Sequence, residues 1–140
     1  MRVLLDANLL ISYLLTPHQH SPVVQTILAA GQGRFTLLMP EALLEELVRT
    51  AGEKACLAKR IAHEELQQFT QTLSALGEPI PKITRPIPAI TRDPKDDYLL
   101  AYALIGQADY LVTGDNDLLC LRQVDRLRIV TCRAFWEMLK

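Results

Sequence analysis

The sequence predicts an α/β fold, a three-layer α/β/α sandwich with a central parallel sheet. Short apolar runs, which are typical of buried strands, alternate along the chain with longer stretches of helical periodicity. This alternation favours a parallel sheet with helices on both faces. Acidic residues follow several of the apolar runs, at the sheet edge where open α/β folds bind ligands.

The first half of the chain contains two predicted strands and three predicted helices. The strands are expected at residues 2–5 and 35–38, and the helices at 9–15, at 22–30 and from Pro40 onward. Asn8 and Ser21 supply side-chain oxygens suited to helix caps, and Pro22 suits a first helical turn. Gly31 is expected to end the second helix.

The second half begins with an amphipathic helical stretch and continues through a proline-rich loop. We expect helix over residues 53–76 with a break near Lys59, ending at Gly77. Five of the eight prolines lie between residues 79 and 94, which predicts a loop with a short edge strand at 81–84. Further elements are expected as a helix at 94–105, a strand at 110–113, a short helix from 116, a strand at 128–131 and a last helix carrying Trp136.

Length and composition predict one domain over residues 1–140 and a cytoplasmic protein. The chain is 49% hydrophobic and has no internal repeat. The leucine-rich start is too short to cross a bilayer, so no membrane association is expected. Three cysteines without a CxxC pair disfavour a zinc knuckle or a disulfide framework. A net charge of −1 provides no global positive field for nucleic acid, so such binding must be local or use metal ions.

Four carboxylates far apart in sequence predict a divalent-metal site: Asp6, Glu46, Asp96 and Asp115. Asp6 ends the first apolar run, and Asp115 follows the run at 110–112. Two carboxylates about 5 Å apart repel by about 3 kcal/mol at an effective dielectric constant near 20. A cluster of them must take up protons or bind a cation. Oxygen-only ligands favour Mg²⁺ or Mn²⁺ over zinc.

Each acid also has a purely structural interpretation. Asp96 occupies the third position of a helix that Asp93 can cap, as in a capping box. Asp6 could be a turn residue, and Asp115 could belong to a turn that leads into a helix. Glu46 and Glu45 lie on the same polar side of their predicted helix, and a helical projection does not separate them.

Four stretches resemble PIN-domain ribonucleases, in particular the VapC-like toxin components of toxin–antitoxin systems. They are RVLLDANLLIS at residues 2–12, PEALLEEL at 40–47, RDPKDDYLLAYA at 92–103 and ADYLVTGDNDLL at 108–119. They occur in the family's order and span nearly the whole chain. The resemblance implies four acidic ligands, Asp6, Glu46, Asp96 and Asp115, with Asp117 as an accessory acid, Asn8 and Thr113 as polar partners, and Asp97 as the rival of Asp96 if the register differs by one.

The resemblance also implies an activity and its partners. Members hydrolyse RNA phosphodiester bonds with one or two Mg²⁺ or Mn²⁺ ions, which activate water, and leave a 5′-phosphate and a 3′-hydroxyl. Basic residues that could contact RNA at the rim are Arg49, Arg85, Arg92 and Arg122. A cognate antitoxin and a homodimer are expected. Leu66, Phe69 and Leu73 could form a partner surface, although a role in the core is favoured.

Two other classes of function remain as alternatives. A PIN fold without chemistry could serve as a protein-binding module, although all the expected acids are present. A receiver-type phosphoacceptor domain also uses an acidic Mg²⁺ pocket. It needs an aspartate after a central strand and a lysine after a later one. The runs at 35–38 and 128–131 lack these residues, which disfavours a receiver.

Overall fold

The computed structural model describes residues 1–15, 20–53 and 59–140, and within them a mostly parallel sheet. Its spatial order is β3-β2-β1-β4-β6-β5. The strands are β1 (Arg2–Leu5), β2 (Thr36–Pro40), β3 (Glu78–Ile80), β4 (Tyr110–Val112), β5 (Gln123–Val124) and β6 (Leu127–Val130). Neighbouring strands are parallel except β5 and β6, which form an antiparallel pair at one edge.

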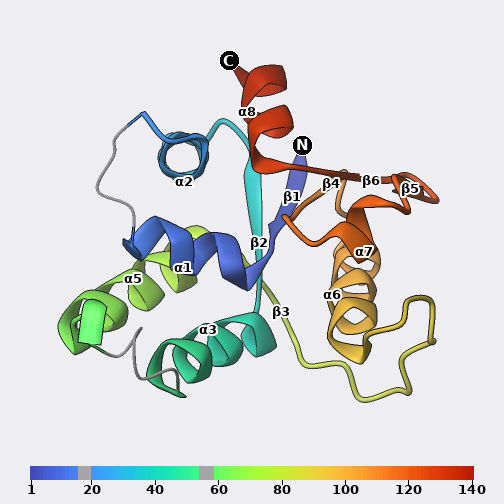
Figure 1. The fold of residues 1–140 in the computed structure, drawn as a ribbon, viewed down its shortest axis with the longest axis horizontal. Coiled ribbons are helices and arrows are strands. Elements are labelled where there is room, and N and C mark those ends of the chain that lie inside the picture. Colours follow the sequence, from blue (N-terminus) through green and yellow to red (C-terminus); the bar gives the residue numbers. More distant parts are fainter. Residues whose placement is uncertain (16–19, 54–58) are drawn as a thin grey trace.

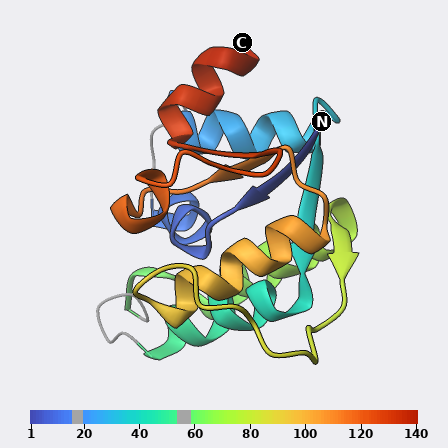
Figure 2. The same cartoon turned by 90° about the vertical axis from the view of Figure 1, so that its right-hand side faces the viewer.

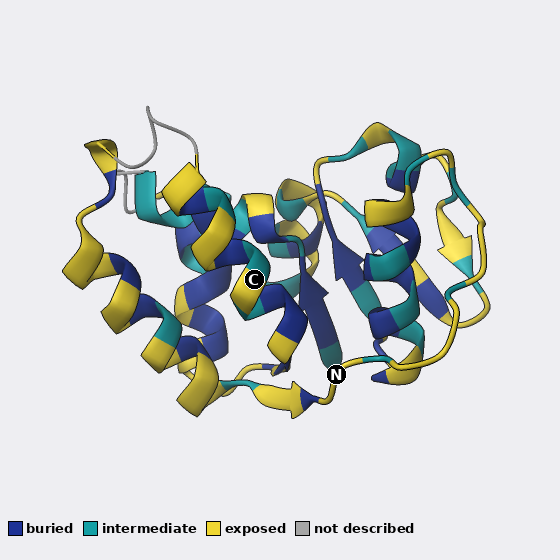
Figure 3. Ribbon diagram, turned by 90° about the horizontal axis from the view of Figure 1, so that it is seen from below, coloured by how far each residue is buried: buried dark blue, intermediate teal, exposed yellow. Residues whose placement is uncertain are grey.

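Helices cover both faces of this sheet. They are α1 (Ala7–Leu15), α2 (Pro22–Gly31), α3 (Glu41–Glu53), α5 (His63–Leu76), α6 (Pro94–Ile105), α7 (Asn116–Leu119) and α8 (Cys132–Leu139). Figure 1 shows α1, α2, α3 and α5 on one side of β2, with α6 and α7 on the other. Buried residues concentrate on the strands and on the inner sides of the helices (Figure 3). The predicted fold class is confirmed.

The central strands explain where a site can form. Leu4 of β1 is fully buried and lies between Leu38 of β2 and Leu111 of β4. From β1 the chain goes on to β2 and β3 on one side of this strand, and then returns to β4 and β6 on its other side. This reversal of strand order opens a crevice beyond the carboxyl ends of β1 and β4. Asp6 begins there, and its backbone N–H donates to Val112 O at 3.0 Å.

Asp6, rather than Asn8, caps the first helix. The helix begins at Ala7, two residues earlier than predicted, because the Asp6 side chain accepts a hydrogen bond from Asn8 N (3.1 Å). The Asp6 backbone oxygen accepts from Leu9 N at 3.0 Å. One residue therefore ends β1, starts α1 and places a carboxylate at the crevice.

Several strand boundaries also differ from prediction. The second strand runs one to two residues later, to Pro40, and the edge strand is Glu78–Ile80 rather than 81–84. This edge position suits Pro79, which has no N–H to donate. The short β5 was not predicted, because two residues give no periodicity. Its turn to β6 holds Asp125 at φ 54°.

The stretch predicted as one interrupted helix contains the end of α3 and the whole of α5. Residues 54–58 of this prediction lie outside the described residues. The chain is non-helical at residues 61–62, and Ala62 precedes α5 in an extended conformation. Gly77 ends α5 as predicted. A Cβ at Gly77 would lie 2.5 Å from Met39 Cβ, so the close approach to β2 requires glycine here.

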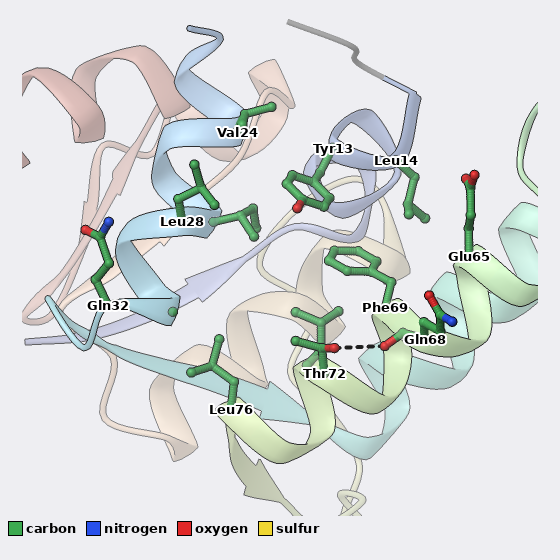
Figure 4. A pocket seen from close by; sticks show the side chains of 13 residues that line it. Tyr13, Leu14, Val24, Leu28, Gln32, Glu65, Gln68, Phe69, Thr72 and Leu76 are labelled. Atoms are coloured by element: carbon green, nitrogen blue, oxygen red, sulfur yellow. Dashed lines mark hydrogen bonds between the residues drawn. The ribbon is translucent and has the colours of Figure 1, made fainter. Parts of the chain in front are cut away.

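The apolar side of α5 belongs mainly to the core. Leu66, Phe69 and Leu73 are buried, and Phe69 stacks on Tyr13 with ring centroids 4.9 Å apart. A groove of about 710 Å³ remains between α1, α2 and α5 (Figure 4). Among the described helices, none has the length and apolar character needed to span a bilayer.

Candidate metal centre

Thr113 connects the acids of β1 and of the loop after β4. Its side chain is fully buried, and its hydroxyl donates to Asp6 Oδ2 at 2.7 Å. The Thr113 hydroxyl oxygen in turn accepts a hydrogen bond from Asp115 N at 3.1 Å. The Thr113 backbone N–H donates to Val130 O of β6 (3.0 Å), which fixes the residue between adjacent strands. Two acids distant in sequence are thus held beside each other through one hydroxyl.

Three carboxylates converge beside this link. Asp96 lies in the first turn of α6, Asp115 precedes α7, and Asp117 lies in α7. Each can offer an oxygen within 4.8 Å of the others. Asp115 Oδ1 is oriented by a hydrogen bond from Asp117 N at 2.9 Å. The two helix starts therefore place the three carboxylates at one point of the crevice.

The capping-box interpretation of Asp96 is wrong. Asp93 caps α6 by accepting from Lys95 N at 2.9 Å, but its own N–H donates to the Thr91 hydroxyl and not to Asp96. Asp96 is only 7% exposed, and its Oδ2 accepts no hydrogen bond from the described residues. An acceptor in this position is costly unless a proton or a cation reaches it.

The electrostatic environment of Asp96 shows that cost. Burial, then the charge of Asp115 and a side-chain hydrogen bond with it, and last the charges of Asp93 and Asp6 together raise the pKa of Asp96 from 3.8 to about 7. An ionised Asp96 is therefore unfavourable at neutral pH without a compensating positive charge.

Asp97 has a different role from its neighbour. Its Oδ1 accepts from Ile90 N at 2.9 Å and from Thr91 N at 2.6 Å. These backbone donors, above all Thr91, lower the pKa of Asp97 below its usual range. The carboxylate holds the proline-rich loop against the start of α6, and Asp97 is not a member of the acid cluster. The structure thus places Asp96, and not Asp97, with Asp115 and Asp117.

Glu46 and Glu45 also separate in the structure. Glu45 forms an exposed ion pair with Lys82 (2.6 Å). Glu46 is half-buried, and its pKa is raised by burial and by the nearby Asp6, while Arg49 and Lys95 lower it. Glu46 therefore faces the crevice from α3, next to Asp6 but outside the group of three convergent acids. The loop residue Lys82 could not be linked to Glu45 from helical periodicity.

The predicted rim residues occupy different surroundings. Arg92 pairs with Asp117 at 2.6 Å although its side chain is 87% exposed. Arg49 lines a cavity beside Glu46. Arg85 and Arg122 are exposed, and no contact joins them to the acids among the described residues. Asn8 lines a shallow hollow together with Asp115.

Comparison with known proteins identifies the family. A model of the PIN domain family matches residues 2–117. The chain belongs to the PIN domain family. Its fold is also similar to a chain in the crystal structure of VapBC2 from Rickettsia felis bound to a DNA fragment from their promoter. That match has a TM-score of 0.59 and 16% identity, and it covers 92% of this chain and 97% of the other. No curated protein matches the sequence.

The residues of this PIN domain fit a divalent cation. The donors are carboxylate oxygens together with the Asn8 and Thr113 side chains, which suits Mg²⁺ or Mn²⁺. The partnerless Asp96 Oδ2 beside Asp115 and Asp117 is the feature that a cation would satisfy. Among the described residues, the ion pair of Arg92 is with Asp117 and not with Asp96 or Asp115.

Proposed function

We propose that this protein is a Mg²⁺- or Mn²⁺-dependent endoribonuclease of a single domain over residues 1–140, and the toxin of a toxin–antitoxin pair. The observation that carries the proposal is the buried Oδ2 of Asp96, which has no hydrogen-bond partner among the described residues and belongs to a carboxylate within reach of Asp115 and Asp117. Its position beyond the carboxyl ends of β1 and β4 suits a ligand site. Membership of the PIN domain family supports nuclease chemistry.

Each acid has a distinct task in this proposal. Asp96, Asp115 and Asp117 hold the metal directly, with Asp6 and Glu46 completing the negative wall of the crevice. When bound, the metal supplies Lewis-acid stabilisation of charge at phosphorus and makes water a better nucleophile. Thr113 keeps Asp6 oriented, and Asn8 offers a polar contact at the hollow it shares with Asp115. The carboxylates position the reacting groups and are not themselves nucleophiles.

Arg92 is the rim cation best placed to contact RNA. It lies beside the cluster through Asp117, and its exposed guanidinium can turn toward a phosphate without losing buried contacts. Guanidinium groups bind phosphate oxygens in a bidentate manner, which would orient the strand. Arg49 has a comparable position on the Glu46 side of the crevice.

An antitoxin partner is part of the proposal. Its support is the similarity in fold to the VapBC2 chain. A homodimer and a cytoplasmic location are proposed with it. A catalytically silent PIN module that only binds protein is the second candidate, and the complete set of acids disfavours it.

Cleavage assays test the proposed activity. We expect the purified protein to degrade RNA with Mg²⁺ or Mn²⁺, and EDTA to stop it. Asp6→Asn and Asp96→Asn should abolish cleavage while the circular dichroism spectrum is retained. Asp125→Asn is the matched control, since it removes one exposed carboxylate at the β5–β6 turn and asparagine tolerates a positive φ. Unchanged cleavage by both crevice variants would refute the site, and complete inactivity of the parent would favour the silent module.

A further inference from the structure

A second cavity adjoins the acid cluster on the Glu46 side. It has a volume of about 360 Å³ and lies between α3 and α6, the helices seen near each other in Figure 2. Its lining residues are Ala42, Glu45, Glu46, Arg49, Pro94, Lys95 and Tyr98. The volume is within the range of pockets that take small ligands, roughly 300–1,000 Å³. Glu46 lines this cavity and also lies near Asp6, and Pro94 and Lys95 of the lining directly precede Asp96, so a molecule in the cavity would lie next to the metal centre.

Two cations, Arg49 and Lys95, line this cavity. Within the described part of the chain, neither Arg49 nor Lys95 forms an ion pair. Both lie close enough to Glu46 to lower its pKa. The other acid of the lining, Glu45, is already paired with Lys82. The lining thus holds two acids and two cations, but because Glu45 is paired with Lys82, the two unpaired cations share one remaining carboxylate, Glu46, and are suited to a phosphate group.

An aromatic ring completes the cavity. Tyr98 is half-buried and packs edge-to-face against Tyr102, with ring centroids 4.7 Å apart. Tyr102 is itself held by a hydrogen bond from Ile83 N to its hydroxyl (2.9 Å). Tyr98 is thus a supported ring that also lines the opening. Cations beside an aromatic platform are the usual means of binding a single strand, since the cations contact phosphate and the ring stacks on a base.

We propose that this cavity binds the nucleotide of single-stranded RNA adjacent to the scissile phosphate, with Arg49 and Lys95 on its phosphate and Tyr98 against its base. The proposal rests on the proposed ribonuclease function and adds a subsite to it. Lys95 and Tyr98 were not singled out from the sequence. They lie on either side of Asp96 and Asp97 in α6, so the helix that supplies the metal ligand also supplies the subsite.

Binding measurements separate the subsite from the chemistry. Anisotropy of a labelled single-stranded RNA oligomer is measured with Ca²⁺ replacing Mg²⁺, over a range of salt concentrations. The double variant Arg49→Gln/Lys95→Gln should lower the slope of log affinity against log salt by about 0.7 to 1.4. The matched double variant Arg126→Gln/Arg128→Gln, which removes two exposed charges near the opposite sheet edge, should keep the parent slope.

The ring is tested by two substitutions at one position. Tyr98→Leu should weaken RNA binding by about 5-fold to 100-fold, the usual effect of losing one stacked base. Tyr98→Phe should bind within about twofold of the parent, because the stacking face is retained. Thermal unfolding identifies a leucine variant that fails to fold. If the leucine variant fails to fold, RNA binding by the Tyr98→Phe variant and by the Arg49→Gln/Lys95→Gln variant tests the subsite instead.

Three outcomes would overturn the inference. If the parent cleaves RNA and the Arg49/Lys95 double variant binds RNA like its control, the subsite is refuted and the proposed ribonuclease function stands. If the parent neither binds nor cleaves RNA, the subsite and the proposed ribonuclease function are both refuted. If the double variant keeps RNA binding but loses a protein partner captured by the parent, the cavity is a protein contact instead.

Discussion

Replacing Asp96 by asparagine should stabilise the metal-free protein at alkaline pH. The folded state keeps the Asp96 proton up to about pH 7, whereas the unfolded chain releases it near the usual value of 3.8. Between these values the folded state binds more protons, so its free energy of unfolding falls as pH rises from about 4 to about 7. Asparagine has nearly the same shape and carries no charge, so the variant lacks this loss.

The size of the effect follows from the pKa. At 1.36 kcal/mol per unit, the rise from 3.8 to about 7 corresponds to at most about 4 kcal/mol. Water entry and side-chain movement relieve part of such a penalty, so we expect a difference of about 2 kcal/mol at pH 8. Mg²⁺ should reverse the order, since a ligand present at 100 times its dissociation constant stabilises the folded parent by about 2.7 kcal/mol.

These differences in the free energy of unfolding can be measured by urea unfolding of the parent and of Asp96→Asn. Each protein is unfolded at pH 4.5 and at pH 8, once with EDTA and once with Mg²⁺. The two proteins should be close at pH 4.5, the variant should be the more stable at pH 8 in EDTA, and the parent should gain more from Mg²⁺ than the variant does. A variant that is equal to or less stable than the parent at pH 8 in EDTA, with the same dependence on pH, would show that Asp96 is not a strained buried acid.

Three further substitutions test the neighbouring contacts. Asp97→Ala should destabilise the protein by about 1–3 kcal/mol in urea unfolding, because two backbone N–H groups lose their acceptor. Since the pKa of Asp97 is lowered in the folded state, this difference should be present at neutral pH and vanish as pH falls through the folded pKa. A difference that persists in acid would contradict the role of the ionised carboxylate as acceptor for these N–H groups. Thr113→Val should weaken Mn²⁺ binding by about 10-fold to 100-fold in calorimetry, because Asp6 loses its orienting donor, and unchanged affinity would exclude that role. Arg92→Gln should lower the affinity for RNA and reduce its salt slope by about 0.7, while Mn²⁺ affinity is kept or improved by the loss of the ion pair to Asp117; an unchanged slope would remove Arg92 from the RNA path.

The fold was largely predictable because its signals are local. Apolar runs specified β1, β2, β4 and β6 to within two residues, and Ser21, Pro22 and Asp93 marked helix starts correctly. The errors arose where a residue serves tertiary contacts. Asp6 took the cap predicted for Asn8 because its carboxylate ends a central strand. Strand β5 is too short to have a pattern and exists through pairing with β6.

Three of the acids singled out from the sequence, Asp96, Asp115 and Asp117, converge in the structure, but the geometry around them was not predictable. Spacing alone did not distinguish Asp96 from Asp97 or Glu46 from Glu45. In both pairs a partner from the proline-rich loop separates the two: the Ile90 and Thr91 amides engage Asp97, and Lys82 engages Glu45. That loop has no periodicity, so its contacts could only be found in three dimensions.

Titration of the protein with Mn²⁺ by calorimetry, in parallel with Asp96→Asn, tests most directly whether the crevice is a metal site. We expect the parent to take up one or two ions with saturable heat, the variant to lose at least one of them, and Asp125→Asn to bind as the parent does. A parent that takes up no Mn²⁺, or an Asp96→Asn variant with the same stoichiometry and affinity, would contradict the assignment.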